Sequence, residues 1–161
     1  MSGDYAYILE SVGLHPELNI VDINPPESAY IIKSVEVWWY SSAVEVSGGY
    51  AYVTDGNPFT NGGSIKIIDV DPPESAHIIS SVTIPYDGYG FAISGGYAYI
   101  ACHYSYIDHY SELAIVDIDP PFSAHHVSSF DTGMYVESVA VSEGYVYVGC
   151  QVTGLSILKL W

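Results

Sequence analysis

The sequence predicts an all-β protein in which similar groups of strands repeat along one chain of 161 residues. A Ser-Gly-x-Tyr turn or a close variant begins at Ser2, Ser47, Ser94 and Ser142, at spacings of 45, 47 and 48 residues. An apolar run of the type IVDI recurs in step with this turn, and a Pro-Pro pair follows three of the runs. Three markers with one period indicate structural repeats, and the period is that of a β-propeller blade.

The first two strands of each repeat follow the glycine turn. The segments YAYIL, YAYVT, YAYIA and YVYVG carry the aromatic and β-branched residues that suit a half-buried pleated surface. The apolar runs LNIVDI, IKIIDV, LAIVDI and LSILKL come next, and such nearly continuous runs are typical of sheets covered on both faces. The Pro-Pro pair ends this second strand because proline cannot donate a ladder hydrogen bond.

Two further strands complete the repeat. The third is expected in AYIIKSVEV, AHIISSVTI and AHHVSSFDT, and the fourth in SAVEV, GFAIS and ESVAVS. No apolar stripe of helical period is present. With the strands of a blade lettered A to D from the channel outwards, the chain has the order BCD, ABCD, ABCD, ABC. We therefore expect one domain (residues 1–161), repeats at 2–46, 47–93, 94–141 and 142–161, and 14 strands, or about 3.5 to 4 four-stranded blades of roughly 45 residues.

The pattern GGYAYVTDG…IKIIDVDPPESAHIISSV resembles the LVIVD-repeat β-propeller family, which is related to the YVTN-repeat propellers of surface layers. The resemblance extends over essentially the whole chain. It implies a propeller fold and a cell-surface or extracellular location, and it implies no catalytic signature. The last repeat departs from the pattern, because Lys159 stands where Asp22, Asp69 and Asp117 stand in the others.

This strand count leaves both ends of the chain unfinished. Propellers close with about 4 to 8 blades, and a repeat unit cannot bury its faces without neighbours. We expect a head-to-tail homo-oligomer to complete the ring through the terminal blades. A four-bladed ring within one chain and a piece of a longer chain are the alternatives.

The charge balance excludes several partner classes. The chain has 19 Asp and Glu against 3 Lys and Arg, a formal net charge of −16. Nucleic acid and anionic membrane surfaces require more cations than this. No apolar run approaches a membrane span of about 18 residues, so membrane insertion is not expected.

Aromatic side chains gather in the loops that differ most between repeats. Such loops on a rigid scaffold are where binding residues tend to lie. The predicted ligand-binding residues are Trp38, Trp39, Tyr40, Tyr86, Tyr89, Tyr104, Tyr106 and Tyr135. With acidic neighbours, these rings could stack sugars or receive a cationic peptide. The alternative is that they pack between blades or bury a subunit contact.

Other candidate chemistry is weaker. The segment from Cys102 to Glu112 contains imidazole, thiol and carboxylate groups, but its spacing matches no closed metal site. We expect Cys102 and Cys150, at one repeat position, to be free, partly buried thiols. Asp22, Asp69 and Asp117 recur before the Pro-Pro turns, which predicts that they accept backbone N–H bonds there.

The sequence thus predicts a non-enzymatic, extracellular or cell-surface propeller that acts as a binding or assembly module without cofactor or metal. Two alternatives remain: a structural subunit of a fibre or surface layer, and a metal-binding or enzymatic propeller that uses the loop at 102–112.

Overall fold

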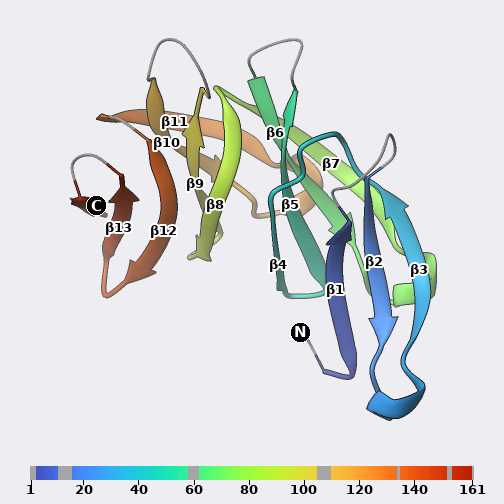
Figure 1. Cartoon of the computed structure of the whole chain (residues 1–161). Coiled ribbons are helices and arrows are strands. Elements are labelled where there is room, and N and C mark those ends of the chain that lie inside the picture. Colours follow the sequence, from blue (N-terminus) through green and yellow to red (C-terminus); the bar gives the residue numbers. More distant parts are fainter. Residues whose placement is uncertain are drawn as a thin grey trace.

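The computed structural model describes residues 3–10, 16–57, 62–104, 110–133, 135–151 and 154–160. These residues form fourteen strands in four antiparallel sheets, which confirms the predicted all-β propeller class (Figure 1). We call the sheets blades 1 to 4 in chain order. In each blade the strands follow one another in space as they do in sequence.

The strand order BCD, ABCD, ABCD, ABC is confirmed. Blade 1 contains β1 (Tyr5–Glu10), β2 (Glu17–Asp22) and β3 (Tyr30–Glu36). Blade 2 contains β4 (Ala43–Ser47), β5 (Tyr50–Asn57), β6 (Gly62–Asp69) and β7 (His77–Ile84). Blade 3 contains β8 (Asp87–Ser94), β9 (Tyr97–His103), β10 (Ser111–Asp117) and β11 (His125–Gly133), and blade 4 contains β12 (Val136–Ser142), β13 (Tyr145–Cys150) and β14 (Gly154–Lys159).

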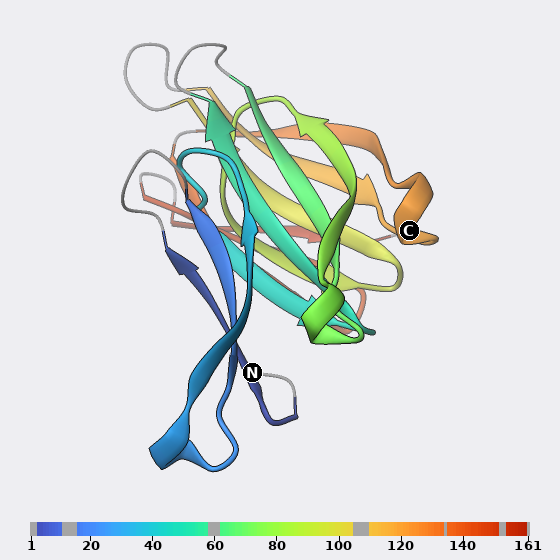
Figure 2. The same ribbon diagram turned by 90° about the vertical axis from the view of Figure 1, so that its right-hand side faces the viewer.

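The repeated aspartates have the turn role that the sequence predicts. The Oδ1 atoms of Asp22, Asp69 and Asp117 accept backbone N–H bonds from the residues two positions later, at 2.8, 3.1 and 3.0 Å. A one-turn 3₁₀ helix follows each bend: η1 (Pro26–Ser28), η2 (Pro73–Ser75) and η3 (Pro121–Ser123). Figure 2 shows these turns as short coiled ribbons at the ends of their blades. In the described residues no helix is long and apolar enough to span a membrane.

Each blade has two different faces, because alternate residues of a strand point to opposite sides of a sheet. One face, here called the tyrosine face, carries the two tyrosines of the YAY-type strand and the Leu or Ile residues opposite them. In blade 1 it consists of Tyr5, Tyr7, Leu9, Leu18 and Ile20. The other face, here called the alanine face, carries in blade 2 Ala51, Val53, Ile68 and Val70.

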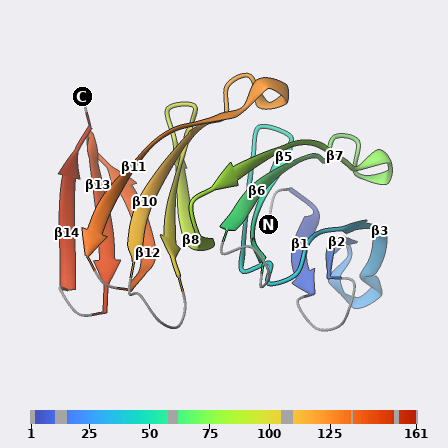
Figure 3. The same ribbon diagram turned by 90° about the horizontal axis from the view of Figure 1, so that it is seen from above.

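The core lies between the blades rather than within any one of them. The tyrosine face of blade 1 packs against the alanine face of blade 2 in one buried cluster. The same pairing joins blade 2 to blade 3 and blade 3 to blade 4. The blades therefore form a row, and Figure 3 shows β3 and β14 at its opposite ends.

Candidate functional site

The predicted aromatic residues that the structure describes lie in two groups on different blades. The first, here called the tryptophan loop, is residues 38–40 between β3 and β4. Trp38, Trp39 and Tyr40 are 59%, 39% and 63% exposed. The second, here called the tyrosine cluster, comprises Tyr86, Tyr89, Tyr104, Tyr110 and Tyr135. Tyr106 lies outside the described residues.

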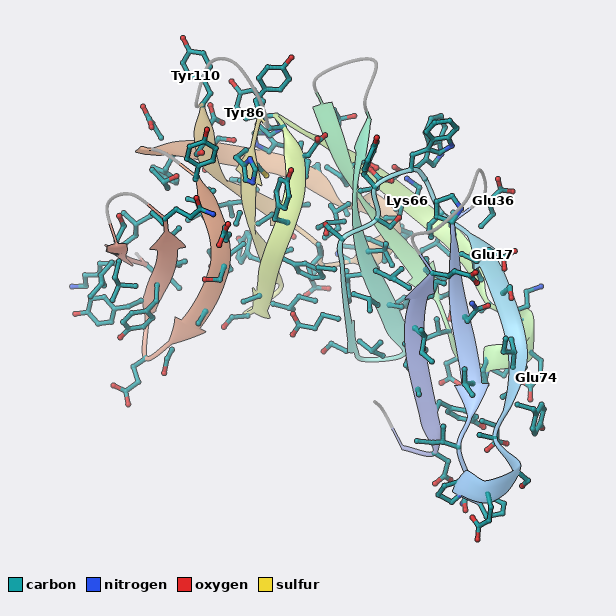
Figure 4. The ribbon with its side chains drawn as sticks, viewed as in Figure 1. Glu17, Glu36, Lys66, Glu74, Tyr86 and Tyr110 are labelled. Carbon is teal, nitrogen blue, oxygen red and sulfur yellow. The ribbon has the colours of Figure 1, made fainter. Side chains whose placement is uncertain are left out.

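Ring contacts join the members of the tyrosine cluster in two subsets. The ring of Tyr86 lies nearly parallel to that of Tyr110, with centroids 6.5 Å apart, and 6.4 Å from that of Tyr104. Tyr110 is 59% exposed, so this part of the cluster faces solvent. Figure 4 shows Tyr86 and Tyr110 at the same end of blade 3. The arrangement provides an exposed aromatic surface on which a flat apolar group can stack.

His103 joins the second subset of the tyrosine cluster, Tyr89 and Tyr135. Its ring stacks on Tyr89 with centroids 3.7 Å apart and meets the edge of Tyr135 at 5.9 Å. Burial lowers the pKa of His103, and the carboxylate of Glu137 opposes this shift in part. The imidazole is therefore neutral at pH 7. From the sequence, His103 is only one of the metal-capable residues in the segment from Cys102 to Glu112, because its stacking partners lie far from it in the chain.

Two of the predicted binding residues have an uncommon backbone conformation. Tyr40 and Tyr135 have φ values of 55° and 53°, in the left-handed region that bulky residues rarely adopt. Each belongs to a loop that joins the outer strand of one blade to the inner strand of the next. The Tyr135 backbone is held by a bond from its N–H to the Ser111 hydroxyl at 2.8 Å. Glu143, in the turn between β12 and β13, has a similar φ of 51°.

A buried ion pair lies beneath the tryptophan loop. Lys66 and Asp55 are 4% and 3% exposed and form a salt bridge. Asp55 also accepts bonds from the Ser64 N–H and hydroxyl at 2.9 and 2.7 Å. The Lys66 ammonium lies 5.7 Å from the centroid of the Trp38 ring, a cation–π distance. A lysine inside the apolar run IKIIDV was the available sequence signal for this pair.

The described residues do not assemble a metal centre around Cys102. No group of three or more His, Cys, Asp or Glu residues in the described ranges has metal-binding geometry, and Asp108 and His109 lie outside them. Burial raises the pKa of Cys102 to about 12, so its thiol is protonated at neutral pH. Cys102 and Cys150 are both free thiols, as predicted. Both are buried, whereas the sequence predicts only partial burial.

The tyrosine face of blade 4 differs from its three counterparts in being uncovered. Leu155 is 60% exposed, whereas the residues at the same repeat position, Leu18, Ile65 and Leu113, are 0–1% exposed. Ile157 is 55% exposed, and its equivalents Ile20, Ile67 and Ile115 are 0–2% exposed. Residues of one type in one register are thus buried at three positions along the row and open to solvent at the fourth.

The alanine face of blade 1 is uncovered in the same way. Ile8 is 50% exposed, while its equivalents Val53, Ile100 and Val148 are fully buried. The tyrosine face of blade 4 and the alanine face of blade 1 are therefore the two halves of the inter-blade contact, one at each end of the row.

The chain is similar to one known repeat family and to several solved structures. A family model for the LVIVD repeat matches residues 1–36, 40–83, 89–132 and 133–158. The computationally designed Ika4 protein is similar in structure, with a TM-score of 0.72 at 10% identity over all of this chain and 88% of that one. A functionally unknown protein from Desulfotomaculum acetoxidans DSM 771 gives a TM-score of 0.42 at 13% identity, over 99% of this chain and 70% of that chain. None of the curated proteins compared with the chain matches it.

Proposed function

This chain belongs to the LVIVD repeat family, and we propose that it is a non-enzymatic assembly module in which a second copy completes the ring of blades. The observation that carries the proposal is the exposure of Leu155, Ile157 and Ile8 at positions that are buried wherever a neighbouring blade is present. Within the chain, each tyrosine face is covered by the alanine face of the next blade. In the assembly, the tyrosine face of blade 4 is covered in the same way by the alanine face of blade 1 of the other copy.

A second copy fits this role better than the chain's own first blade. Blades 1 and 4 lie at opposite ends of the row, so the chain does not close on itself in this structure (Figures 1 and 3). Two copies joined at both ends would contain eight sheets, within the usual range of about 4 to 8 blades. The contact is head-to-tail, and such contacts close into rings where the rotation permits and otherwise extend into filaments.

The apolar surface at these faces supports association. Fully burying a Leu or Ile side chain contributes roughly 1.5–3 kcal/mol, and Leu155, Ile157 and Ile8 are each at least half exposed.

A second, binding function is supported by the tryptophan loop and the tyrosine cluster. The tryptophan loop exposes Trp38, Trp39 and Tyr40, and the tyrosine cluster exposes Tyr110. We propose a glycan or a peptide as the ligand, because planar rings stack on both kinds of molecule. The family resemblance and the acidic composition support a cell-surface or extracellular setting for this module.

The test of assembly is a matched pair of variants followed by sedimentation velocity. Leu155→Ser removes an apolar side chain from the proposed contact, and Val127→Ser removes a 44% exposed one from the outer strand of blade 3. We expect Leu155→Ser to shift the chain toward monomer and Val127→Ser to leave the oligomer intact. Equal behaviour of the two variants would refute the assignment of the contact, and an open polymer would indicate a fibre instead of a ring.

A further inference from the structure

Lys159 stands at a repeat position that aspartate occupies in the other three blades. Its place in the structure indicates a role for this difference. We propose that Lys159 of one copy forms an ion pair with Glu27 of the second copy, so that the junction between copies carries a charge complement that the internal junctions lack. The inference rests on the proposed ring closure and names the polar contact that selects the partner.

Lys159 takes the place of an aspartate on the tyrosine face. It lies opposite Tyr145 on the neighbouring strand, as Asp22 lies opposite Tyr5, Asp69 opposite Tyr50 and Asp117 opposite Tyr97. Lys159 is exposed at the end of β14, whose outer edge has no strand partner in the described residues. Its ammonium is therefore available to a neighbouring molecule.

The internal junctions show what meets this position from the next blade. Asp22 pairs with Tyr30 at the start of β3, and β3 contacts η2 of blade 2, which contains Glu74. Figure 4 shows Glu74 beside β3. Burial raises the pKa of Tyr5, and the carboxylates of Glu74 and Asp22 raise it further, as expected where both lie close to the phenol.

Glu27 is the counterpart of Glu74 in blade 1. It lies in the first turn of η1, as Glu74 does in η2, and it is exposed. If blade 1 of a second copy covers blade 4 as blade 2 covers blade 1, Glu27 comes to lie beside Tyr145 and Lys159. At the junction of blades 2 and 3 the corresponding residue is Phe122.

The junctions then differ in charge. Four carboxylates gather where blades 1 and 2 meet: Asp4, Asp22, Asp71 and Glu74. Where blades 2 and 3 meet there are three, Glu45, Asp69 and Asp119. At the junction between copies, the corresponding positions hold one cation, Lys159, one anion, Glu27, and the neutral residues Asn24, Ala140 and Gly144.

This difference has a physical reason. Consecutive blades are joined covalently, so mutual repulsion at their junction does not separate them. Two chains of net charge −16 repel each other, and the contact between them must avoid adding further like charges. Charge complementarity at an interface also suppresses wrong partners and fixes the register.

The test is a charge-reversal series at Lys159 and Glu27, with dissociation constants measured by sedimentation equilibrium. We expect Lys159→Glu and Glu27→Lys each to weaken association about tenfold, and the double variant to restore it. The controls are Lys33→Glu, on the face of blade 1 that blade 2 covers, and Glu74→Lys, at an internal junction. Each control makes the same change in net charge as one test variant, so it reports the effect of overall charge.

The outcomes separate this inference from ring closure. If the charge reversals act no differently from their controls while Leu155→Ser dissociates the oligomer, the ion pair is wrong and ring closure stands. If the double variant is as weak as the single variants, the two residues do not meet and the pairing is overturned. If the unmodified chain is monomeric at every concentration, both proposals fail.

Discussion

Leu113 and Leu155 occupy one position in two repeats, on β10 and β14, and they differ in surroundings alone. Leu113 is 1% exposed and packs in the cluster between blades 3 and 4, whereas Leu155 is 60% exposed at the end of the row. Both precede an Ile two residues later on the same face of the strand. The blade sequence therefore specifies an apolar surface, and that surface is buried only where a neighbouring blade packs against it.

The largest expected effect concerns the buried ion pair of Lys66 and Asp55 in blade 2. In blade 1, whose alanine face is open, Asn19 stands at the position of Lys66. Asp55→Asn leaves the Lys66 ammonium buried without its counter-charge, and such a change costs about 3–5 kcal/mol of unfolding free energy. Urea denaturation measures the loss. The double variant Asp55→Asn, Lys66→Met should recover most of it, and a single-variant cost below about 1 kcal/mol would show that the pair is solvated.

The next effect tests the two leucines directly. Leu113→Ala should cost about 2–5 kcal/mol, because it leaves a cavity in a packed junction. Leu155→Ala should cost much less when the chain is dilute enough to be monomeric, since the side chain has little to lose. Urea unfolding at low protein concentration gives both values. Similar costs would mean that Leu155 is already covered within a single chain.

A smaller effect is expected from His103. Because burial lowers its pKa in the folded chain, the unfolded chain binds the proton more readily. The contribution of the neutral ring to the free energy of unfolding is fully present above the ordinary histidine pKa of about 6.5. It is lost as the pH falls below that value. His103→Phe should therefore have a shallower decline in stability between pH 7.5 and 5.5 than the unmodified chain. Parallel declines would contradict the burial of the imidazole.

The smallest effect on stability is expected at the tryptophan loop. Replacing Trp38 and Trp39 by Ala should leave the melting temperature nearly unchanged, because both side chains are exposed, while abolishing binding to a glycan or peptide array. A loss of about 3–5 kcal/mol would assign the tryptophans to packing instead of recognition.

The fold followed from the sequence because its signals are local and repeated. Glycine turns, Pro-Pro bends and apolar runs recur with one period, so the strand order BCD, ABCD, ABCD, ABC could be predicted and is confirmed. The turn role of Asp22 was equally local, since its hydrogen bond reaches only two residues along the chain.

The site could be predicted only in part, because its contacts join residues distant in sequence. The aromatic residues were identified from loop divergence, but their separation into two groups depends on which blades carry them. The stacking of His103 on Tyr89 and the burial of Lys66 against Asp55 arise between strands or blades. The strand count did indicate that the two terminal blades lack a neighbour, but the exposure of Leu155 itself follows from the arrangement of the blades, because Leu113 has the same local sequence and is buried.

Sedimentation equilibrium of the unmodified chain over a wide range of concentrations is the most direct test of the proposed junction between copies. A mass that rises to twice the 17.5 kDa of one chain, and falls to one chain in Leu155→Ser, is the predicted result. A mass of one chain at every concentration would refute it.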